Sequence, residues 1–406
     1  MNTPLSARES EVVALAGELA DEFAQTADEH DRENRFPAEN WPRMRDAGYL
    51  RLCVPEELGG FGAGVREFFL AQERLAQGDA ATALAVNMHL APSTLMSLAW
   101  RRFSDQRAER HLRRIATGEE VFASCTSEHG MGGVQGATDA RTAAERVDGG
   151  YRVSGHKIFF TGNQGCTHFS SNARFEDPEL GPRLISFFSP IDAEGIRLKQ
   201  TWDTLGMRAT QSNDVFFEDV FVPDEEVGHS SPAGHFDQRI QQSLFTGAMP
   251  SFGIIFLGAA GGAMDWTRSF VTDKGRTGDG EVQRDFAEME VLRESARAVT
   301  YRHAHEVDSG LWFEALGVRE GLARAAFCKY VCVNNAVAIM NKVMGIVGGQ
   351  GYHRKFPIQR IYRDVLAGPI LPFNNHDTHR ILAEEALDLP PGELGVFDEP
   401  EAGERA

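Results

Sequence analysis

The sequence predicts an α+β protein in which a β-rich unit separates two helical units. Apolar residues recur at the helical spacing over residues 1–120 and again over 233–388, whereas short β-rich runs separated by turns occupy 121–232. A chain of 406 residues also exceeds the size of a single simple core. We therefore expect an N-terminal helical domain, a middle domain built as an antiparallel sheet or small barrel, a C-terminal helical domain, and a disordered tail over 389–406.

The N-terminal residues predict several helices with recognisable starts. Ser6 and Glu9 have the spacing of a capping box, and the apolar residues that follow fall on one helical face. Asp79 precedes an apolar stretch over 80–90 and is expected to cap it. Asp105 is expected to begin the last helix of this region.

The middle region predicts strands joined by tight turns. The Asp-Gly-Gly run at 148–150 is typical of a hairpin turn, and the residues at 228–234, rich in glycine and serine, are interpreted as a linker. Strands are expected over 122–126, 141–147, 151–160, 184–188 and 215–222.

One stretch of the C-terminal region has nearly the length and apolar character of a membrane span. Residues 241–264 carry no charge and include Gly258 and Gly262 at the GxxxG spacing. Several glycines and Pro250 lower the hydrophobicity of this stretch, however, and no belt of aromatic and basic residues flanks it. We therefore predict a buried helix that packs closely through its small residues, and no membrane partner.

The composition narrows the class of protein. Lys and Arg total 41 against 59 Asp and Glu, giving a net charge of -18, which argues against a nucleic-acid partner. The 5 cysteines are scattered without CxxC spacing, so neither a disulfide framework nor a cysteine zinc site is predicted. With no signal-peptide pattern at the N-terminus, we expect a cytoplasmic protein.

Glycines near the C-terminus predict either a ligand contact or a simple helix end. Gly348, Gly349 and Gly351 let the backbone approach a ligand closely, but a glycine C-cap followed by a helix hairpin explains them equally. A charged, helical segment then restarts, and Pro369 and Pro372 end it.

Two stretches of the middle region could carry chemistry. Residues 157–163 place a ring and a hydroxyl at a strand end, which suits a flavin but is also typical of core packing. Residues 124–133 form a glycine-rich loop after a strand, where backbone N–H groups can meet phosphate or carbonyl oxygens. His129 lies in this loop, but no second ligand follows at helical spacing, and we assign no metal site.

Several motifs, taken in their order, resemble the acyl-CoA dehydrogenase superfamily of flavoproteins over residues 5–388. No single motif is decisive, whereas the shared order is specific. The matching stretches are Thr126-Ser127-Glu128, Gly155-His156-Lys157 through Thr161, Leu205-Gly206-Met207-Arg208-Ala209-Thr210, Phe217 through Pro223, and Gly348-Gly349-Gln350-Gly351-Tyr352 with Arg363-Asp364.

The resemblance implies a middle β-barrel domain, a C-terminal four-helix bundle, and a dimer or tetramer of identical chains. It also implies FAD between the middle and C-terminal domains, with the adenosine end reaching a neighbouring subunit. The residues that it assigns to the cofactor are Thr126, Thr138, Phe159, Thr161, Lys274, Arg276, Gly348, Gly349, Gly351 and Asn374.

The chain departs from the family pattern at the catalytic base. Family dehydrogenases use a carboxylate to remove the α-proton of an acyl thioester, and the corresponding position here is Pro372. No Asp or Glu lies between Asp364 and Asp377, and residues 238–264, which hold the base in some relatives, are also free of acids. The nearest candidates are His376, since histidine is a common general base, and Asp377.

Three functions remain open from the sequence. The first is α,β-dehydrogenation of an acyl thioester, carried by coenzyme A or a carrier protein, with an electron-transfer flavoprotein or oxygen as acceptor. The second is a flavin monooxygenase of the related branch, which needs no α-proton base. The third is a non-catalytic subunit that pairs with an active paralogue.

Overall fold

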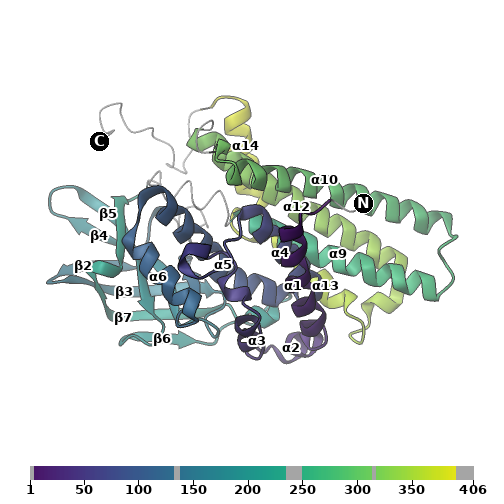
Figure 1. The fold of residues 1–406 in the computed structure, drawn as a ribbon, viewed down its shortest axis with the longest axis horizontal. Helices are drawn as coiled ribbons and strands as arrows, with labels where there is room; N and C mark the ends of the chain where they lie inside the picture. Colours follow the sequence, from purple (N-terminus) through teal and green to yellow (C-terminus); the bar gives the residue numbers. More distant parts are fainter. Residues whose placement is uncertain (1–3, 132–137, 235–248, 313–316, 390–406) are drawn as a thin grey trace.

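The computed structural model describes residues 4–131, 138–234, 249–312 and 317–389, and it confirms the predicted α+β class. Figure 1 shows a twisted sheet at one end, the C-terminal helices at the other, and the N-terminal helices between them. The tail predicted to be disordered lies almost entirely outside the described residues.

The N-terminal helices begin where the capping residues predict. Ser6 and Glu9 form a complete capping box, and the Asp79 carboxylate accepts from the amides of Ala81 and Thr82. The helix after Asp79 is longer than predicted and passes through Pro92. The elements are α1 (Ala7–Phe23), α2 (Ala27–Glu33), α3 (Asn40–Asp46), η1 (Tyr49–Arg51), η2 (Glu56–Leu58), α4 (Val65–Gly78), α5 (Ala80–Phe103) and α6 (Gln106–Thr117).

The middle region forms one eight-stranded sheet in the order β6-β7-β3-β2-β4-β5-β8, with β1 paired to β4. The sheet is mixed and not purely antiparallel as expected, because β1 and β2 both run parallel to β4. Within the described residues no hydrogen-bonded pairing joins the end strands β6 and β8, so a closed barrel is not observed there. The strands are β1 (Phe122–Cys125), β2 (Ala143–Val147), β3 (Gly150–Phe160), β4 (His168–Asp177), β5 (Gly181–Pro190), β6 (Ile196–Lys199), β7 (Asn213–Pro223) and β8 (Val227–Pro232).

Three strands were not predicted, namely β4, β6 and β8, and two of them, β4 and β8, pair with β5. Residues 228–234, interpreted as a linker, largely belong to β8, which pairs antiparallel with β5. The sequence of β4 has no β-branched residue and places Phe169 and Phe175 among polar and charged residues, so its strand signal is weak. Both strands are held by backbone pairing with β5.

The C-terminal region is helical, as predicted. Long helices α9, α10 and α12 pack together, and α14 packs on α12. Gly348 ends α12 with φ 66°, which confirms its expected role as a helix C-cap. The elements are α9 (Met249–Asp273), α10 (Gly280–Asp308), α12 (Val318–Val347), η6 (Gly348–Tyr352), α13 (Ile358–Val365), η7 (Gly368–Ile370) and α14 (Asn375–Ala386).

Close packing through glycine in α9 is confirmed. A Cβ added at Gly258 would lie 2.3 Å from the carbonyl oxygen of Glu73 in α4, and one added at Gly262 would lie 2.3 Å from that of Gln77. Such distances are shorter than any real Cβ contact, so α4 and α9 approach as closely as they do only because these residues are glycines.

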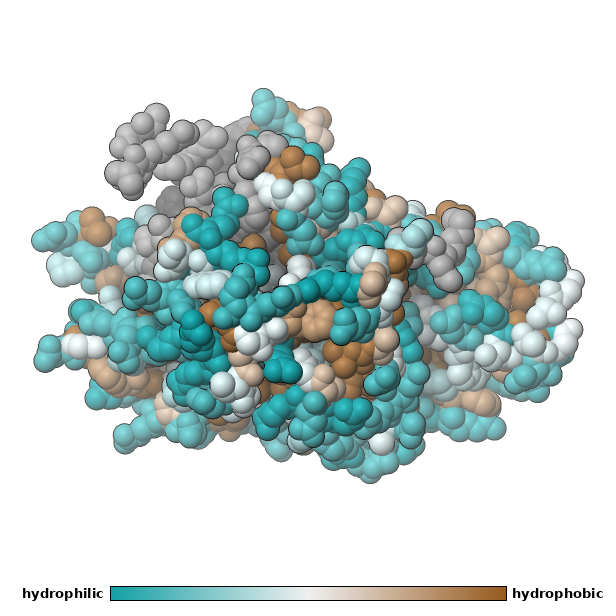
Figure 2. Space-filling model, in the orientation of Figure 1, coloured by the Kyte–Doolittle hydropathy of each residue, from teal (hydrophilic) through white to brown (hydrophobic). Residues whose placement is uncertain are grey.

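Only one helical segment within the described residues, 319–352, has the length and composition of a membrane span, and it comprises most of α12 with η6. Its contacts with α9, α10 and α14 account for this apolar character, since it is a core helix of the bundle. Hydrophilic residues cover most of the face seen in Figure 2, with smaller apolar areas among them.

Candidate functional site

The end of β3 presents an aromatic ring to the outside. Phe159 has a positive φ of 57° and a side chain that is 58% exposed. Its ring meets that of Trp202 edge to face, with centroids 6.0 Å apart. A constrained backbone that holds a large apolar ring in the open is the kind of feature that function, rather than core packing, explains.

A chain of hydroxyl groups lies beside this ring. Thr161 Oγ1 is 2.7 Å from Ser212 Oγ, which is 2.8 Å from Thr210 Oγ1. The Thr210 hydroxyl donates to the Met207 carbonyl at 2.8 Å, and a carbonyl can only accept. Since each hydroxyl has one proton, Ser212 must donate to Thr210 and Thr161 to Ser212. Thr161 therefore presents an acceptor oxygen to any ligand at this strand end.

The loop that carries Trp202 and Met207 is held by α13. The Met207 amide donates to Asp364 Oδ1 at 2.5 Å, and Trp202 Nε1 donates to the Met207 carbonyl at 3.0 Å. Burial raises the pKa of Asp364 to about 6, and the nearby Arg360 opposes this rise. Asp364 thus supports the contact between the Phe159 and Trp202 rings indirectly, through the backbone of the loop.

The neighbouring Arg363 also serves as a structural link. Its guanidinium pairs with both carboxylate oxygens of Asp31 in α2 and donates to the Leu205 carbonyl at 2.7 Å. The predicted Arg-Asp motif therefore joins the C-terminal region to the N-terminal helices and to the loop before β7.

The loop after β1 is fixed by a buried ion pair. The Lys157 ammonium lies 2.6 Å from Glu128 Oε1, and Glu128 also accepts from the amides of Arg141 and Thr142. Burial tends to raise the pKa of Glu128, but Lys157 and these hydrogen bonds outweigh it and lower the pKa. Lys157 also lies 3.5 Å from the Thr126 carbonyl, so it positions that predicted cofactor residue.

Thr138 lies apart from the strand end of β3. Its side chain is buried, and its carbonyl accepts from the Gly234 amide at 2.9 Å. Its predicted place near a pyrophosphate stays a prediction.

The other predicted cofactor residues lie at the far end of α9 and α12. Nothing lies within 4 Å of a Cβ added at Gly348 or Gly349, so the space on this side of each glycine is open. Arg276 donates to the Ile346 carbonyl at the end of α12 at 2.9 Å and lies 3.4 Å from Asp279, while Lys274 is exposed. Gly351 is instead packed against the side chains of Met344 and Val347.

The two candidate bases lie on the first turn of α14. Asn374 caps this helix by accepting from the Asp377 amide at 3.0 Å, and its own amide group donates to Asp377 Oδ2 at 2.8 Å. Asp377 also lies 3.9 Å from Arg380, and His376 is exposed. Asn374 thus has a clear structural role, and the roles proposed for all three residues stay predictions.

A buried lysine that the sequence analysis missed lies beside Pro372. Lys329 of α12 donates to the carbonyls of Leu371 and Phe373 at 2.7 and 2.6 Å. Burial lowers its pKa to about 7, although Asp377 opposes this effect. A lysine within an apolar helix was the available signal, and only the fold shows what it contacts.

The residues at the end of β3 fit a flavin ring. An isoalloxazine needs an apolar wall and a hydrogen-bonding group near its reactive nitrogen, and Phe159 with Trp202 and Thr161 supply these. Lys157 and Glu128 keep the adjacent loop in place. These groups on one chain therefore accommodate the ring, while the space beside Gly348 and Gly349, where a side chain would lie, is open.

Comparison with known proteins gives matches along the chain. Models for the N-terminal, middle and C-terminal domains of acyl-CoA dehydrogenase match residues 7–119, 123–220 and 239–375. YdbM of Bacillus subtilis, named as a candidate acyl-CoA dehydrogenase, is 32% identical over 91% of this chain and 94% of its own.

The name of one further relative, and the ligands bound in one similar solved structure, indicate a different chemistry. The amino sugar nitrososynthase DnmZ of Streptomyces peucetius is 28% identical over 88% of each chain. The solved structure of KijD3 in complex with FMN and dTDP-3-amino-2,3,6-trideoxy-4-keto-3-methyl-D-glucose is 25% identical, covers 97% of each chain, and superposes with a TM-score of 0.87.

Proposed function

Because the chain belongs to the acyl-CoA dehydrogenase superfamily, whose members are flavin oxidoreductases, we propose that it is a flavin-dependent monooxygenase acting on a polar amine. The observation that carries this proposal is the segment between Asp364 and Asp377, which contains no carboxylate where a dehydrogenase places its base. A monooxygenase of this fold requires no such group.

The contacts around the segment support this choice. Asp364, which precedes it, is buried against the Met207 amide, and Asp377, which follows it, is engaged by the capping Asn374. Lys329 holds the carbonyls on both sides of Pro372. Neither acid is free to reach a substrate α-proton without breaking a structural hydrogen bond.

The hydroxyl chain supports the same proposal. Thr161 presents an acceptor because its proton is directed to Ser212. A reduced flavin carries an N–H at N5, and an oxidised flavin does not. Thr161 would offer an acceptor to a reduced flavin, and a bound reduced flavin would supply the electrons for reaction with O2.

The chain's own residues would orient and shield the reacting ring. Phe159 and Trp202 form its apolar wall and exclude water from one side. The amine substrate class comes from the names of DnmZ and from the amino-sugar nucleotide in the KijD3 complex, both of which describe those proteins. Oxygenation of an amine nitrogen is therefore the first reaction to test.

The test is oxygen consumption by the purified chain. We expect uptake that depends on an amino-sugar nucleotide when FMN or FAD is kept reduced by a separate flavin reductase, with a product heavier by one oxygen atom. Reductase without this chain is the control, because free reduced flavin also consumes oxygen. Uptake that no amine increases, together with flavin bleaching by an acyl thioester under anaerobic conditions, would contradict the proposal.

Acyl-thioester dehydrogenation is the second candidate, and the identity to YdbM favours it. In that reaction His376 or Asp377 would act as the base, and an electron-transfer flavoprotein or oxygen would accept the electrons. We also infer that the chain works as a cytoplasmic dimer or tetramer, since Gly348 and Gly349 remain open to a neighbouring copy. A chain that binds flavin but turns over neither substrate class would be the non-catalytic subunit.

A further inference from the structure

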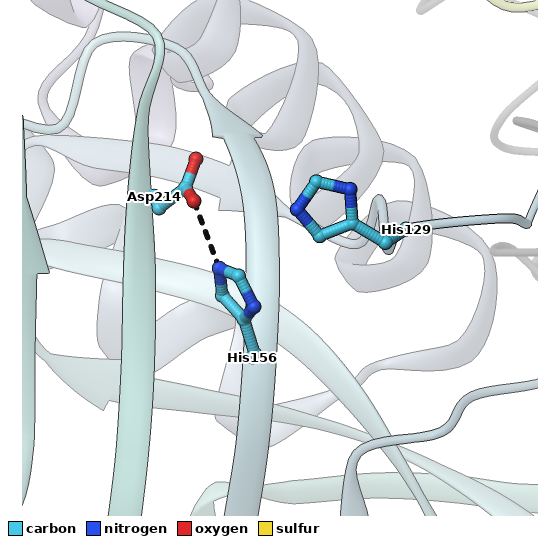
Figure 3. A group of neighbouring side chains, drawn as sticks. All are labelled: His129, His156 and Asp214. Atoms are coloured by element: carbon cyan, nitrogen blue, oxygen red, sulfur yellow. Dashed lines mark hydrogen bonds and ion pairs between the residues drawn. The ribbon is translucent and has the colours of Figure 1, made fainter. Parts of the chain in front are cut away.

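We propose that His129, His156 and Asp214 form a binding site for one divalent transition-metal ion, such as Zn²⁺. The ligand atoms of these three side chains all lie within 4.8 Å of one another, although they come from three separate segments. Figure 3 shows the His129 ring on its loop turned toward the strands that carry the other two. Two imidazoles and a carboxylate are a donor set that first-row transition metals prefer over Mg²⁺ or Ca²⁺.

Two of the ligands are already in contact. His156 on β3 and Asp214 on the neighbouring β7 meet through Nε2 and Oδ2 at 2.9 Å. Both side chains are partly buried, so they are shielded without being closed to solvent. A metal ion placed between them would replace this hydrogen bond by two coordinate bonds.

Groups around these ligands fix their orientation. Thr201 donates to Asp214 Oδ1 at 2.8 Å, which leaves Oδ2 directed at the histidine. The His156 ring stacks on Phe216, with centroids 4.1 Å apart and an angle of 11° between the planes. Arg197 covers the same Phe216 ring at 4.3 Å. Outer contacts of this kind orient the ligands of metal sites.

The third ligand, His129, lies on a loop whose backbone is anchored, while its own side chain is exposed to solvent. Glu128 anchors the loop through Lys157 and Thr142, and the carbonyl of His129 accepts from Arg141 at 2.8 Å. The His129 side chain is exposed, and its ring centroid is 5.2 Å from that of His156. Its rotamer can therefore adjust while the backbone stays in place.

The three ligand atoms need to move only slightly closer together to coordinate one ion. Bonds of about 2.0 to 2.2 Å from a tetrahedral ion place its ligand atoms about 3.4 Å apart. The ligand atoms now lie up to 4.8 Å apart, and rotation of the exposed His129 side chain would bring its nitrogen to the shorter distance. Three protein ligands leave a fourth position for water, and the ion would tie the loop that carries Thr126 to the sheet.

The site lay outside what sequence spacing reveals. His129, His156 and Asp214 are joined by the pairing of β3 with β7 and by the path of the loop after β1. The absence of a second ligand near His129 in sequence is therefore no argument against a metal ion here.

The test is Zn²⁺ binding to the untagged full-length chain, measured by equilibrium dialysis with metal analysis. We expect one ion per chain, and we expect His129→Ala or Asp214→Asn to weaken binding by more than about tenfold, with Thr201→Val weakening it by about tenfold. His305→Ala, which removes an exposed histidine of α10, should change nothing. Because all the cysteines are buried, they offer no competing surface site.

Far-UV circular dichroism and the unfolding midpoint, recorded without metal, separate a lost ligand from a lost fold. A folded His129→Ala chain that still binds Zn²⁺ like the wild type would overturn the proposal. So would a wild-type chain that binds no Zn²⁺ at a concentration of about 100 μM, well above that needed for a three-ligand site.

Discussion

His89 is a buried histidine of α5 that uses both ring nitrogens for structural hydrogen bonds. The Phe122 amide donates to Nδ1 at 2.9 Å, and Nε2 lies 2.6 Å from the Leu50 carbonyl. Because an amide N–H can only donate, Nδ1 must be unprotonated and Nε2 must carry the proton. The neutral ring thus connects α5 with η1 and β1, and burial lowers its pKa to about 4.

This lowered pKa predicts a loss of stability in acid. The neutral ring contributes fully above the unfolded-state pKa of about 6.5, and this contribution is lost as the pH falls through about 4. The difference corresponds to about 3 kcal/mol at full protonation. Urea unfolding between pH 7 and pH 4 should therefore show a steeper decline for the wild type than for His89→Gln. Parallel curves for the two chains would contradict the assignment.

The long-range contacts of single side chains could not be predicted from the sequence. The pairing of Lys157 with Glu128 and the contacts of Lys329 with the carbonyls around Pro372 are long-range, and no local spacing predicts them. The resemblance to a known family points to Phe159 and Thr161, but the direction of the hydroxyl chain depends on Ser212, which it does not indicate. A motif identifies a residue type, whereas the fold decides its partner.

Among the elements, the contact between α13 and the loop before β7 supports the candidate site. A Cβ added at Gly206 would lie 2.2 Å from the Arg363 carbonyl oxygen and 2.8 Å from the Asp364 amide. Only glycine permits this approach, which also brings Asp364 to the Met207 amide. The loop then places Trp202 against Phe159.

Gly206→Ala should accordingly weaken both the fold and flavin binding. The added methyl group meets backbone atoms that cannot rotate away, so we expect a loss of about 1 to 3 kcal/mol in the free energy of unfolding. Flavin should bind more weakly because the ring wall shifts with the loop. Denaturant midpoints and flavin titration measure the two effects. Gly278→Ala is the matched control, since nothing lies within 4 Å of its added Cβ.

Elements that depend on neighbouring residues were predicted well, whereas strands that depend on pairing with a distant strand were predicted poorly. Helix starts at Ser6, Asp79 and Asp105 follow from capping, which depends on neighbouring residues only. Strand β8 was interpreted as a linker because its Gly-His-Ser-Ser-Pro sequence has no strand signature. Its strand conformation comes from pairing with β5, which a local pattern does not encode.

Across the whole molecule, the N-terminal and C-terminal helices share one hydrophobic core, whereas the sheet has its own. The shared core runs from Val12 of α1 to Val365 of α13. A buried ionic contact crosses the same boundary, where Glu73 of α4 lies 2.8 Å from Arg297 and accepts from Tyr301, both of α10. The two helical regions that the sequence separates by the sheet are therefore expected to unfold together.

The glycines of α9 provide the test of this coupling. Gly262→Ala would place a Cβ 2.3 Å from the Gln77 carbonyl oxygen and force α4 away from α9. Gly261→Ala is a control from the adjacent position, because its nearest contact would be an ordinary 3.9 Å from Gln77 Nε2. We expect Gly262→Ala to lower stability by about 1 to 3 kcal/mol and Gly261→Ala to leave it equal or higher, since alanine favours helix.

Calorimetry is combined with circular dichroism at 222 nm, where the signal comes mainly from helices. Together they show whether the helices unfold as one unit. If they share a core, Gly262→Ala moves the whole helical transition to lower temperature. Two separate helical transitions, of which only one responds to the substitution, would show that residues 7–117 and 249–386 are stable independently. In that case the contact of α4 with α9 would be a surface between domains, and the flavin site would depend on how that surface closes.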